Sequence, residues 1–440
     1  MWPYHEALLA TPVPRYTSYP TAADFVDGPG AAAMAVELES IGADTPLSLY
    51  LHIPFCEQIC WYCGCNTGRT NRPGRLTSYM EALEAEIDLV GARLGGRGKV
   101  QRIAFGGGSP NAIAADVFLG LVARLKSALN CDDPVISVEL DPRSFTDDWA
   151  DALKSAGVSR VSLGVQTLSE PIQRAIGRVQ PVAMIREVVG KLRGAGITSI
   201  NFDLMYGLPG QGLAELEETL GQAFEMRPER VALFGYAHVP HLIPRQQQID
   251  ASSLPDARLR FDQAARGHEL LVGEGYEAIG FDHFAVREDA IAVATREGKL
   301  RRNFQGFTED QSDILIGLGA SSISQFPGGI LQTEKNAGRY RMNVLTGRLP
   351  QTRGILRTTA DGERGGIIER LLCAGKADFG GLPDREALVE KMQPFVEHGL
   401  IGLDGYAVTL TEAARPYARV IAACFDEYRA VAPRKFSSAI

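Results

Sequence analysis

Short runs of apolar residues alternate with longer segments of helical periodicity through the first two thirds of the chain. In the longer segments apolar residues recur at steps of three and four, which is typical of amphipathic helices, and several of them end at glycine. The short runs are almost continuously apolar, as strands are when a sheet is covered on both faces. They are residues 47–53, 102–107, 135–140, 160–165, 199–207 and 231–237. This pattern predicts a parallel sheet built from six strand–helix units.

The segments between these runs with the spacing of amphipathic helices are residues 116–129, 149–157, 183–196 and 213–226. An earlier helix is predicted to start near Ser78, because Ser78 and Glu81 have the spacing of a capping box. Apolar residues form one stripe from Leu76 to Leu94. A seventh strand is expected at residues 277–285, where it would extend one edge of the sheet.

Six strands alternating with helices predict an α/β fold, a partial (β/α)6 barrel of the TIM type, since a complete barrel needs eight strands. Polar residues and glycines gather at the C-terminal ends of the six runs. They are His52, Gly106–Gly108, Glu139, Gln166, Asp203 and His238. A single buried His or Asp is usually satisfied by hydrogen bonds. Barrels build their active sites at this edge, so these positions together predict one shared cleft.

The chain is expected to divide into four segments. Residues 1–45 form an N-terminal segment able to close over a site, residues 46–290 the barrel, residues 291–354 an extension of it, and residues 355–440 a mainly helical domain. In this last part a helix, a second helix, a hairpin turning at Asp404–Gly405 and a closing helix follow in the order of a winged helix. Acidic and basic residues balance there without a basic stripe, so we expect a packing or lid role and no nucleic-acid binding.

The composition is that of a globular chain with a sizeable core: of 440 residues, 45% are hydrophobic and 22% are charged. The formal net charge of −8 indicates neither a nucleic-acid surface nor a polybasic membrane patch. The N-terminus lacks a basic start followed by an apolar stretch, and no apolar run reaches about 18 residues. These features predict a cytoplasmic protein without a membrane span.

Cys56, Cys60 and Cys63 follow one another at steps of four and three residues, and Cys65 comes two residues later. Thiolates hold iron–sulfur clusters, and three of them on a cubane would leave one iron without a protein ligand. An open coordination position makes a metal site reactive. The spacing leaves open whether three or all four cysteines bind iron. A zinc site is disfavoured, because it would normally show a second Cys or His pair.

Several motifs accompany the cysteines: RYTSYPTA from Arg15, YLHIPFC from Tyr50, CGCN, GGGSP, VELDPR, LGVQ, NFDLMYGLPGQ, YAHVP, GFDHFA and RNFQGF. The C-x3-C-x2-C spacing resembles the signature of radical S-adenosylmethionine (SAM) enzymes. With the other motifs, the chain resembles one family of that superfamily along most of its length, the oxygen-independent coproporphyrinogen III oxidases of haem biosynthesis. RYTSYPTA and Cys65 distinguish the chain from related haem chaperones, which lack that motif and usually carry an aromatic residue at the position of this cysteine.

This resemblance implies a 4Fe-4S cluster and two SAM molecules. Cys56, Cys60 and Cys63 would bind the cluster, with Cys65 outside the ligand set, and the open iron would chelate the first SAM. The positions that match contacts to the first SAM are Tyr50, Gly107, Glu139 and Ile323. The positions that match contacts to the second are Tyr62, Gly64, Gly108, Ser109, Gln166, Arg178, Asp203 and Ala237. The residue types agree, because glycines allow close approach and carboxylates accept hydrogen bonds from hydroxyl and ammonium groups.

The implied reaction is two successive oxidative decarboxylations, which turn two propionate side chains of coproporphyrinogen III into vinyl groups and give protoporphyrinogen IX. The residues expected to take part in catalysis are Tyr50, Glu139, Arg178 and Gln305. The candidates for holding the substrate's carboxylates are Arg15, Arg178, Arg301, Arg302 and Gln305. A purely structural role for Arg301 and Arg302 is an equal alternative. The resemblance also implies an electron donor such as a flavodoxin or a ferredoxin, and we expect the enzyme to act as a monomer.

The chain departs from the family pattern at two places. The usual Gly-Gly-Thr-Pro-Thr is replaced by residues 107–111, in which Ser109 keeps the hydroxyl group, and Gly235 stands where an asparagine is common. Three other functions are weighed against the leading one: a haem chaperone on the same barrel, a radical SAM enzyme that opens or methylates haem, and, remotely, a zinc-bound structural protein. The mass of the product and an analysis of iron and sulfide separate them.

Overall fold

The computed structural model describes residues 2–70 and 73–431 of the chain. Its main feature is a sheet of thirteen strands, and six neighbouring strands in chain order run parallel in it. These are β2 (Pro46–Ile53), β5 (Lys99–Gly107), β6 (Val135–Leu140), β7 (Val158–Gln166), β8 (Ser199–Tyr206) and β9 (Arg230–Gly235). The predicted α/β fold with a parallel core is confirmed.

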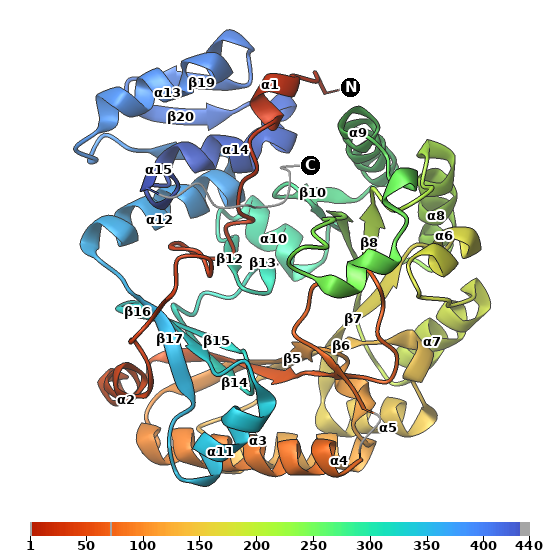
Figure 1. Ribbon diagram of the computed structural model, residues 1–440, viewed down its shortest axis with the longest axis vertical. Helices are drawn as coiled ribbons and strands as arrows, with labels where there is room; N and C mark the ends of the chain where they lie inside the picture. Colours follow the sequence, from red (N-terminus) through yellow and green to blue (C-terminus); the bar gives the residue numbers. More distant parts are fainter. Residues whose placement is uncertain (1, 71–72, 432–440) are drawn as a thin grey trace.

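The sheet curves around an interior space, passing from β17 through β5 and β7 to β8 (Figure 1). In β8 the side chains of Ile200, Phe202 and Leu204 are buried, whereas Asn201 and Asp203 are half-buried. Successive side chains of a strand point to opposite faces of the sheet. The half-buried set therefore lines the interior, and the buried set packs against the helices outside.

Helices cover the outer, convex face of the sheet (Figure 1). They are α3 (Pro73–Leu94), α4 (Ala115–Ala128), α5 (Asp147–Ala156), α7 (Val182–Gly194), α8 (Leu213–Glu225) and α9 (Ala257–Gly273). Each of the four helices predicted between the strands is present. In α5 the Thr146 hydroxyl accepts the Trp149 N–H at 3.3 Å at the start, and Gly157 ends the helix with a φ of 75°.

Two local predictions are wrong. Ser78 and Glu81 do not start a helix, because α3 already runs from Pro73, a residue suited to a first helical turn. Residues 277–285 form not one strand but a hairpin, β10 (Glu277–Ile279) and β11 (His283–Ala285), and β11 pairs antiparallel with β9. The hairpin does extend the edge of the sheet.

The opposite edge of the sheet, which the apolar pattern did not predict, is built from a later part of the chain and one short strand near the N-terminus. There β14 (Ile314–Leu318) lies parallel to β2. Antiparallel strands continue from it: β15 (Ile323–Phe326), β16 (Gly329–Thr333), β17 (Gln351–Leu356) and β1 (Val26–Asp27). The separate hairpin of β12 (Arg301–Asn303) and β13 (Gly306–Thr308) precedes them. The second half of the chain thus completes one wall of the barrel.

The last part of the chain packs beside the barrel as helices around a small sheet of order β18-β20-β19. Its elements are α12 (Thr359–Ala374), β18 (Lys376–Asp378), α13 (Arg385–Glu397), β19 (Ile401–Asp404) and β20 (Ala407–Leu410). The hairpin turn lies at Gly405–Tyr406, one residue later than predicted, because Asp404 already pairs with Ala407. The prediction of a single closing helix is wrong. The structure has two short helices there, α14 (Ala418–Ala422) and α15 (Tyr428–Val431), with 3-10 turns before and between them.

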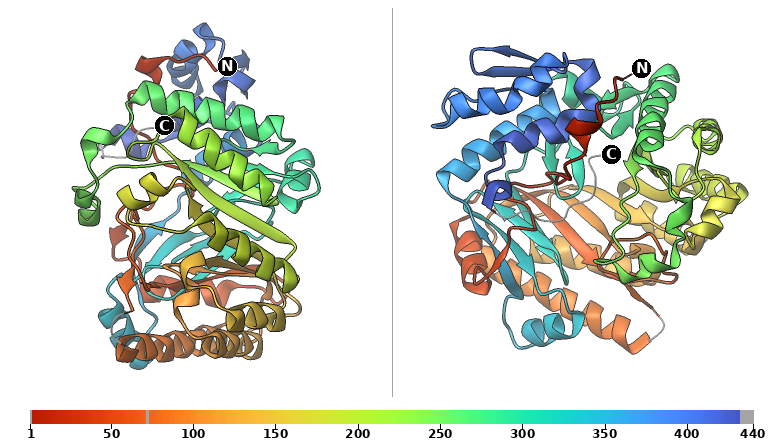
Figure 2. Two further views of the ribbon diagram at one scale, coloured as in Figure 1. Left: turned by 90° about the vertical axis from the view of Figure 1, so that its right-hand side faces the viewer. Right: turned by 45° about the horizontal axis from the view of Figure 1, so that its top comes forward.

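The N-terminal segment, with α1 (Glu6–Leu9) and α2 (Ala31–Ser40), lies partly between this last part and the barrel (Figure 2). The Tyr417 hydroxyl donates to the Pro3 carbonyl oxygen at 2.6 Å, and the Trp2 ring lies beside α9. The segment therefore joins the two parts of the molecule.

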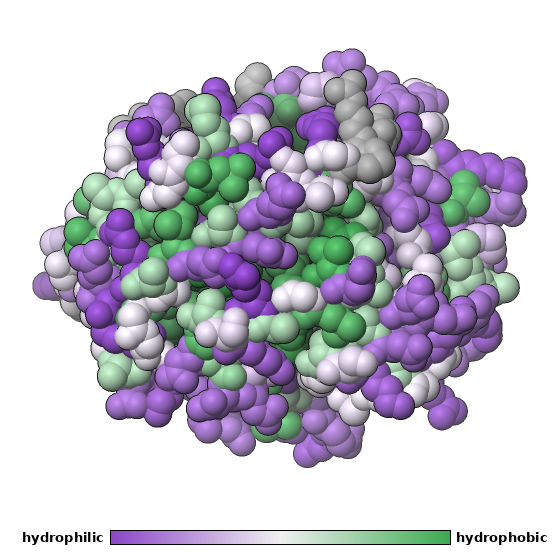
Figure 3. Space-filling model, turned by 90° about the horizontal axis from the view of Figure 1, so that it is seen from below, coloured by the Kyte–Doolittle hydropathy of each residue, from purple (hydrophilic) through white to green (hydrophobic). Residues whose placement is uncertain are grey.

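In the face seen from below, hydrophilic residues surround hydrophobic ones that gather near the middle (Figure 3). Among the described residues, no helix combines the length and the apolar character needed to cross a membrane.

Candidate functional site

The loop that carries the clustered cysteines runs from the end of β2 to α3. Two short strands, β3 (Phe55–Cys56) and β4 (Gly68–Arg69), pair in parallel at its base. The Gln246 side chain donates to the carbonyl oxygens of Tyr62 and Ala237 at 2.9 and 3.0 Å. The loop is thereby tied to the segment that follows β9.

All four loop cysteines line a cavity of about 190 Å³ at the C-terminal ends of the parallel strands. Cys60 is buried, Cys56 and Cys63 are half-buried, and Cys65 is exposed. The other predicted site residues that line this cavity are Tyr62, Gly107, Gly108, Glu139, Gln166, Arg178 and Asp203. The structure brings these residues of six different segments together.

The remaining predicted residues do not line this cavity; they are Tyr50, Gly64, Ser109, Ala237, Gln305 and Ile323. Gln305 lines an adjoining cavity of about 310 Å³ inside the barrel, which shares Glu139 and Asp203 with the first. Ser109 is buried, and its hydroxyl donates to Asn111 Oδ1 at 2.5 Å instead of facing the cavity.

The glycines at the end of β5 let β2 and the start of the cysteine loop approach closely. A β-carbon on Gly107 would lie 2.5 Å from the His52 ring, and one on Gly108 would lie 2.4 Å from the Phe55 carbonyl oxygen. Gly107 also has a φ of 110°, which side-chain-bearing residues rarely adopt. These glycines have a packing role here, whether or not a ligand also approaches them.

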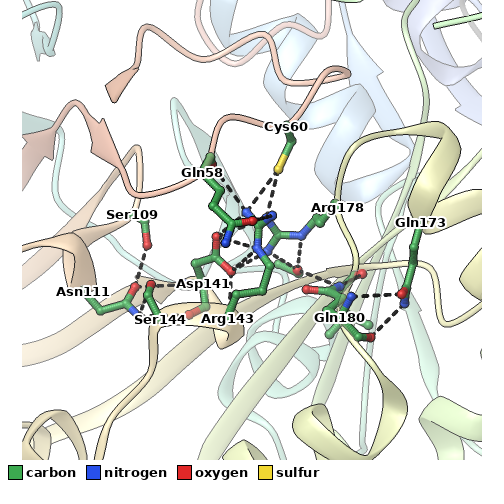
Figure 4. A network of polar contacts seen from close by, with 12 residues as sticks. Gln58, Cys60, Ser109, Asn111, Asp141, Arg143, Ser144, Gln173, Arg178 and Gln180 are labelled. Atoms are coloured by element: carbon green, nitrogen blue, oxygen red, sulfur yellow. Dashed lines mark hydrogen bonds and ion pairs between the residues drawn. The ribbon is translucent and has the colours of Figure 1, made fainter. Parts of the chain in front are cut away.

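Two buried arginines contact Cys60 (Figure 4). Arg178 Nη1 and Arg143 Nη2 donate to Cys60 Sγ at 3.2 and 3.3 Å. Asp141 accepts from both, at 3.3 Å from Arg178 and 2.6 Å from Arg143. Burial alone would raise the pKa of Asp141, but the two guanidinium groups outweigh it and lower the pKa to about 2. Sequence reasoning missed Asp141 and Arg143 as site residues, although both belong to the VELDPR stretch.

Two carboxylates, Glu139 on β6 and Asp203 on β8, line both cavities. Glu139 Oε2 accepts the Gly107 N–H at 3.3 Å, and Asp203 accepts from Ser162 Oγ and Asn201 Nδ2, both at 2.8 Å. Burial, together with the charge of Asp203, raises the pKa of Glu139 to about 7, and burial also raises the pKa of Asp203. Glu139 can therefore take up or release a proton near neutral pH.

Arg301 and Arg302 are engaged inside the protein. Arg301 pairs with Glu369 at 2.8 Å. The Arg302 guanidinium lies 4.3 Å from the centre of the Phe307 ring and donates to the Tyr16 carbonyl oxygen at 3.1 Å. Of the two alternatives, binding the substrate or a structural role, these contacts support the structural role, in which Arg302 holds the N-terminal segment.

The residues of the cysteine cavity fit an iron–sulfur cluster. Within the described ranges, no three His, Cys, Asp or Glu side chains converge on the position of one metal ion. A cubane does not require such convergence, because its thiolates bind different irons. Cys56, Cys60 and Cys63 surround one cavity, and the two arginines that donate to Cys60 Sγ supply the positive charge and hydrogen bonds that thiolate ligands need.

Comparisons with known proteins agree with this geometry. A model of the radical SAM superfamily matches residues 50–223. The oxygen-independent coproporphyrinogen III oxidase of Bradyrhizobium diazoefficiens is 41% identical over 425 residues, which are 94% of each chain. An anaerobic coproporphyrinogen III oxidase of Cereibacter sphaeroides is 39% identical, again over 94% of each chain. The solved structure of coproporphyrinogen III oxidase (HemN) from Escherichia coli, described as a radical SAM enzyme, is 34% identical and superposes with a TM-score of 0.90, covering 97% of this chain and 99% of that one.

Proposed function

Because the chain belongs to the oxygen-independent coproporphyrinogen III oxidase family of radical SAM enzymes, we propose that it decarboxylates two propionate side chains of coproporphyrinogen III and gives protoporphyrinogen IX. Each conversion of a propionate to a vinyl group removes carbon dioxide, one hydrogen atom and one electron. The observation that carries the proposal is the single cavity in which three cysteines meet Glu139, Arg178 and Asp203.

A 4Fe-4S cluster with SAM, when bound, supplies a radical able to take a hydrogen atom from the propionate β-carbon. The protein's part is to place the reactants and to exclude water. Cys56, Cys60 and Cys63 are the proposed cluster ligands. Arg143 and Arg178 donate hydrogen bonds to Cys60 Sγ, which orients this thiolate and balances its charge.

We propose that two SAM molecules bind. The first would lie near Tyr50, Gly107, Glu139 and Ile323. The second would lie near Tyr62, Gly64, Gly108, Ser109, Gln166, Arg178, Asp203 and Ala237. Gln166 supports such a ligand at the end of β7, because its φ of 64° is uncommon for a residue other than glycine and such outliers cluster at functional sites.

The proposal includes the division of the chain into residues 1–45, 46–290, 291–354 and 355–440. The first of these would close over the substrate, which is supported by its contacts with the barrel, where Arg15 donates to the Gly235 carbonyl oxygen, and with the last segment. A reduced flavodoxin or ferredoxin would supply electrons to the monomer in the cytoplasm.

An anaerobic product assay tests the function. Protein loaded with iron and sulfide, reduced and mixed with SAM and coproporphyrinogen III, is expected to form protoporphyrinogen IX with the loss of two carbon dioxide molecules. Cys60→Ser should abolish product, whereas Cys131→Ser, which changes a cysteine outside the cavity, should retain it. A cluster-loaded wild type without product, or equal activity in both variants, would refute the proposal. A methylated or ring-opened product would instead identify a different radical SAM reaction.

A further inference from the structure

A third cavity, of about 50 Å³, lies where the N-terminal segment, the barrel and the last part of the chain meet. The N-terminal segment contributes Arg15 and α9 contributes Arg260. Arg415 comes from the 3-10 turn before α14, and Arg419 comes from α14 itself. Four guanidinium groups from four segments thus line one small space. No function is assigned to Arg260, Arg415 or Arg419 by the reasoning above.

Among the described residues, few acidic side chains accompany Arg260 and Arg415 in this cavity. Asp282 is the one carboxylate among the residues lining the cavity, and its Oδ1 lies 2.6 Å from His283 Nδ1. Arg260 donates to the uncharged carbonyl oxygen of Tyr236 at 2.7 Å, and Arg415 donates to that of Gly280. Glu412 approaches Arg415 only at 3.4 Å and is mostly exposed.

Donor capacity is also left over. In the part of the chain that the structure describes, the Nε atoms of Arg260 and Arg415 are buried without a hydrogen-bond partner. Nε2 of His268, which lines the same cavity, is also buried without a partner, and it donates or accepts according to the tautomer of the ring. Buried donors are normally satisfied, so these point to an acceptor that completes the site. Burial, together with the charge of Arg15, lowers the pKa of Arg419 to about 10.

Size and chemistry select the ligand. One water needs roughly 10–15 Å³ of cavity volume, so a cavity of 50 Å³ accommodates a group of a few heavy atoms. Guanidinium groups match the planar geometry of a carboxylate and bind it through paired hydrogen bonds. We propose that this cavity, which we call the arginine cavity, receives the carboxylate of a substrate propionate that is not converted. This inference rests on the function proposed above.

The position of the arginine cavity supports that choice of propionate. Phe234 lines both it and the barrel cavity that contains Glu139, Asp203 and Gln305. A reacting propionate must lie in the barrel, within reach of the cysteine cavity. A propionate beyond Phe234 is separated from that chemistry, while the same macrocycle can span both spaces.

Porphyrin binding tests the inference. Mesoporphyrin IX carries only the two propionates that survive the reaction, and its dimethyl ester has the same macrocycle without a carboxylate. Fluorescence titrations of the cluster-loaded protein, in one detergent-containing buffer, would compare Arg415→Gln and Arg419→Gln with wild type. Each variant should weaken the binding of mesoporphyrin IX and coproporphyrin III by about tenfold or more, as expected when a charge-assisted hydrogen bond is lost. Each should leave the affinity of the ester unchanged. Arg348→Gln, at an exposed position outside the three cavities, is the matched control and should change neither affinity.

Three results would overturn the inference: an equal loss for the acid and the ester, no loss for the acid, or a loss for coproporphyrin III that spares mesoporphyrin IX. Equilibrium dialysis with SAM covers the other source of a carboxylate, because Ala237 also lines this cavity. If the variants weaken SAM binding and not porphyrin binding, the carboxylate is that of SAM and the inference is wrong. Should a C-terminal variant fail to fold, Arg260→Gln on α9 gives the same comparison. If the wild type makes protoporphyrinogen IX but the arginine variants bind the porphyrins as tightly as wild type, this inference is refuted and the proposed function stands.

Discussion

A buried carboxyl group on α3 makes the stability of the fold dependent on pH near neutrality. Glu86 is fully buried, and its Oε2 accepts the Gly319 N–H and the Tyr340 hydroxyl, both at 2.7 Å. Its Oε1 has no hydrogen-bond partner within the described residues. Burial raises the pKa of Glu86 to about 7, and these two hydrogen bonds only reduce the effect. The group therefore favours its protonated form in the folded protein.

The magnitude follows from the difference between the folded and unfolded states. A pKa of about 7 in the fold against the ordinary value of 4.5 corresponds to about 3 kcal/mol in the free energy of unfolding. Because the folded pKa is the higher one, this stabilisation is fully present below about pH 4.5 and is lost as the pH rises through about 7. The affected region includes the base of the cysteine loop, since Tyr79 packs beside Tyr340 and donates to the His52 carbonyl oxygen at 2.7 Å.

Glu86→Gln keeps the shape and removes the titration. The free energy of unfolding of wild type and variant is measured with urea at about pH 5 and about pH 8. Relative to wild type, the variant should be more stable at the higher pH than at the lower pH, by about 3 kcal/mol. Glu81→Gln, at an exposed position of the same helix, is the control and should run parallel to wild type at both pH values. A Glu86→Gln variant whose stability follows the wild-type pH profile would refute the reasoning, because the buried carboxyl would then not titrate in this range.

Three further predictions concern the site and its surroundings. Cys60→Ser should lose cluster iron and SAM cleavage while Cys65→Ser keeps the cluster; equal iron loss in both would contradict the three-ligand set. Changing Glu309 to Gln should cost about 3 kcal/mol of stability in urea unfolding, because this carboxylate lies among three partly buried arginines on β5, β7 and β9; a change near zero would contradict the pairing. Gly107→Ala should impair cluster loading much more than Gly96→Ala, because both glycines have positive φ but only the first would place a β-carbon against a histidine ring; equal effects would leave only backbone strain as the cause.

The apolar pattern predicted the central strands well, because each run is long enough to cross the sheet and packs at least one face against helices. It missed the other wall of the barrel for the opposite reason. Strands such as β15 and β16 have four or five residues, and their order in the sheet depends on contacts with distant parts of the chain. One strand is predicted at residues 277–285 because apolar residues stand on both sides of Gly280, but the φ of 58° at this glycine reverses the chain.

Site residues could be predicted where a motif carried them and not where only packing does. The cysteines and Glu139 lie directly at strand ends, so the edge of the sheet brings them together. Arg178 was also expected, but its pairing with Asp141 beside Cys60 depends on how the segment after β7 folds back. Gln246, which ties the cysteine loop down, lies in an irregular segment with no motif of its own to indicate that role.

The arginine cavity shows why net charge is a poor guide to the ligand of this chain. The chain carries a formal charge of −8, which argues against an anionic substrate if charge is counted globally. Charges spread over a surface are screened beyond a Debye length of about 8 Å at physiological ionic strength, whereas groups that line one small cavity act on a ligand almost unscreened. Arg15, Arg260, Arg415 and Arg419 are separated by up to about four hundred positions in sequence and meet only because the N-terminal segment and α14 pack against the end of β9. An acidic protein can therefore present a cationic receptor to a carboxylate, and its position on the far side of Phe234 from Glu139 determines which part of a large anion is held and which part is left to react.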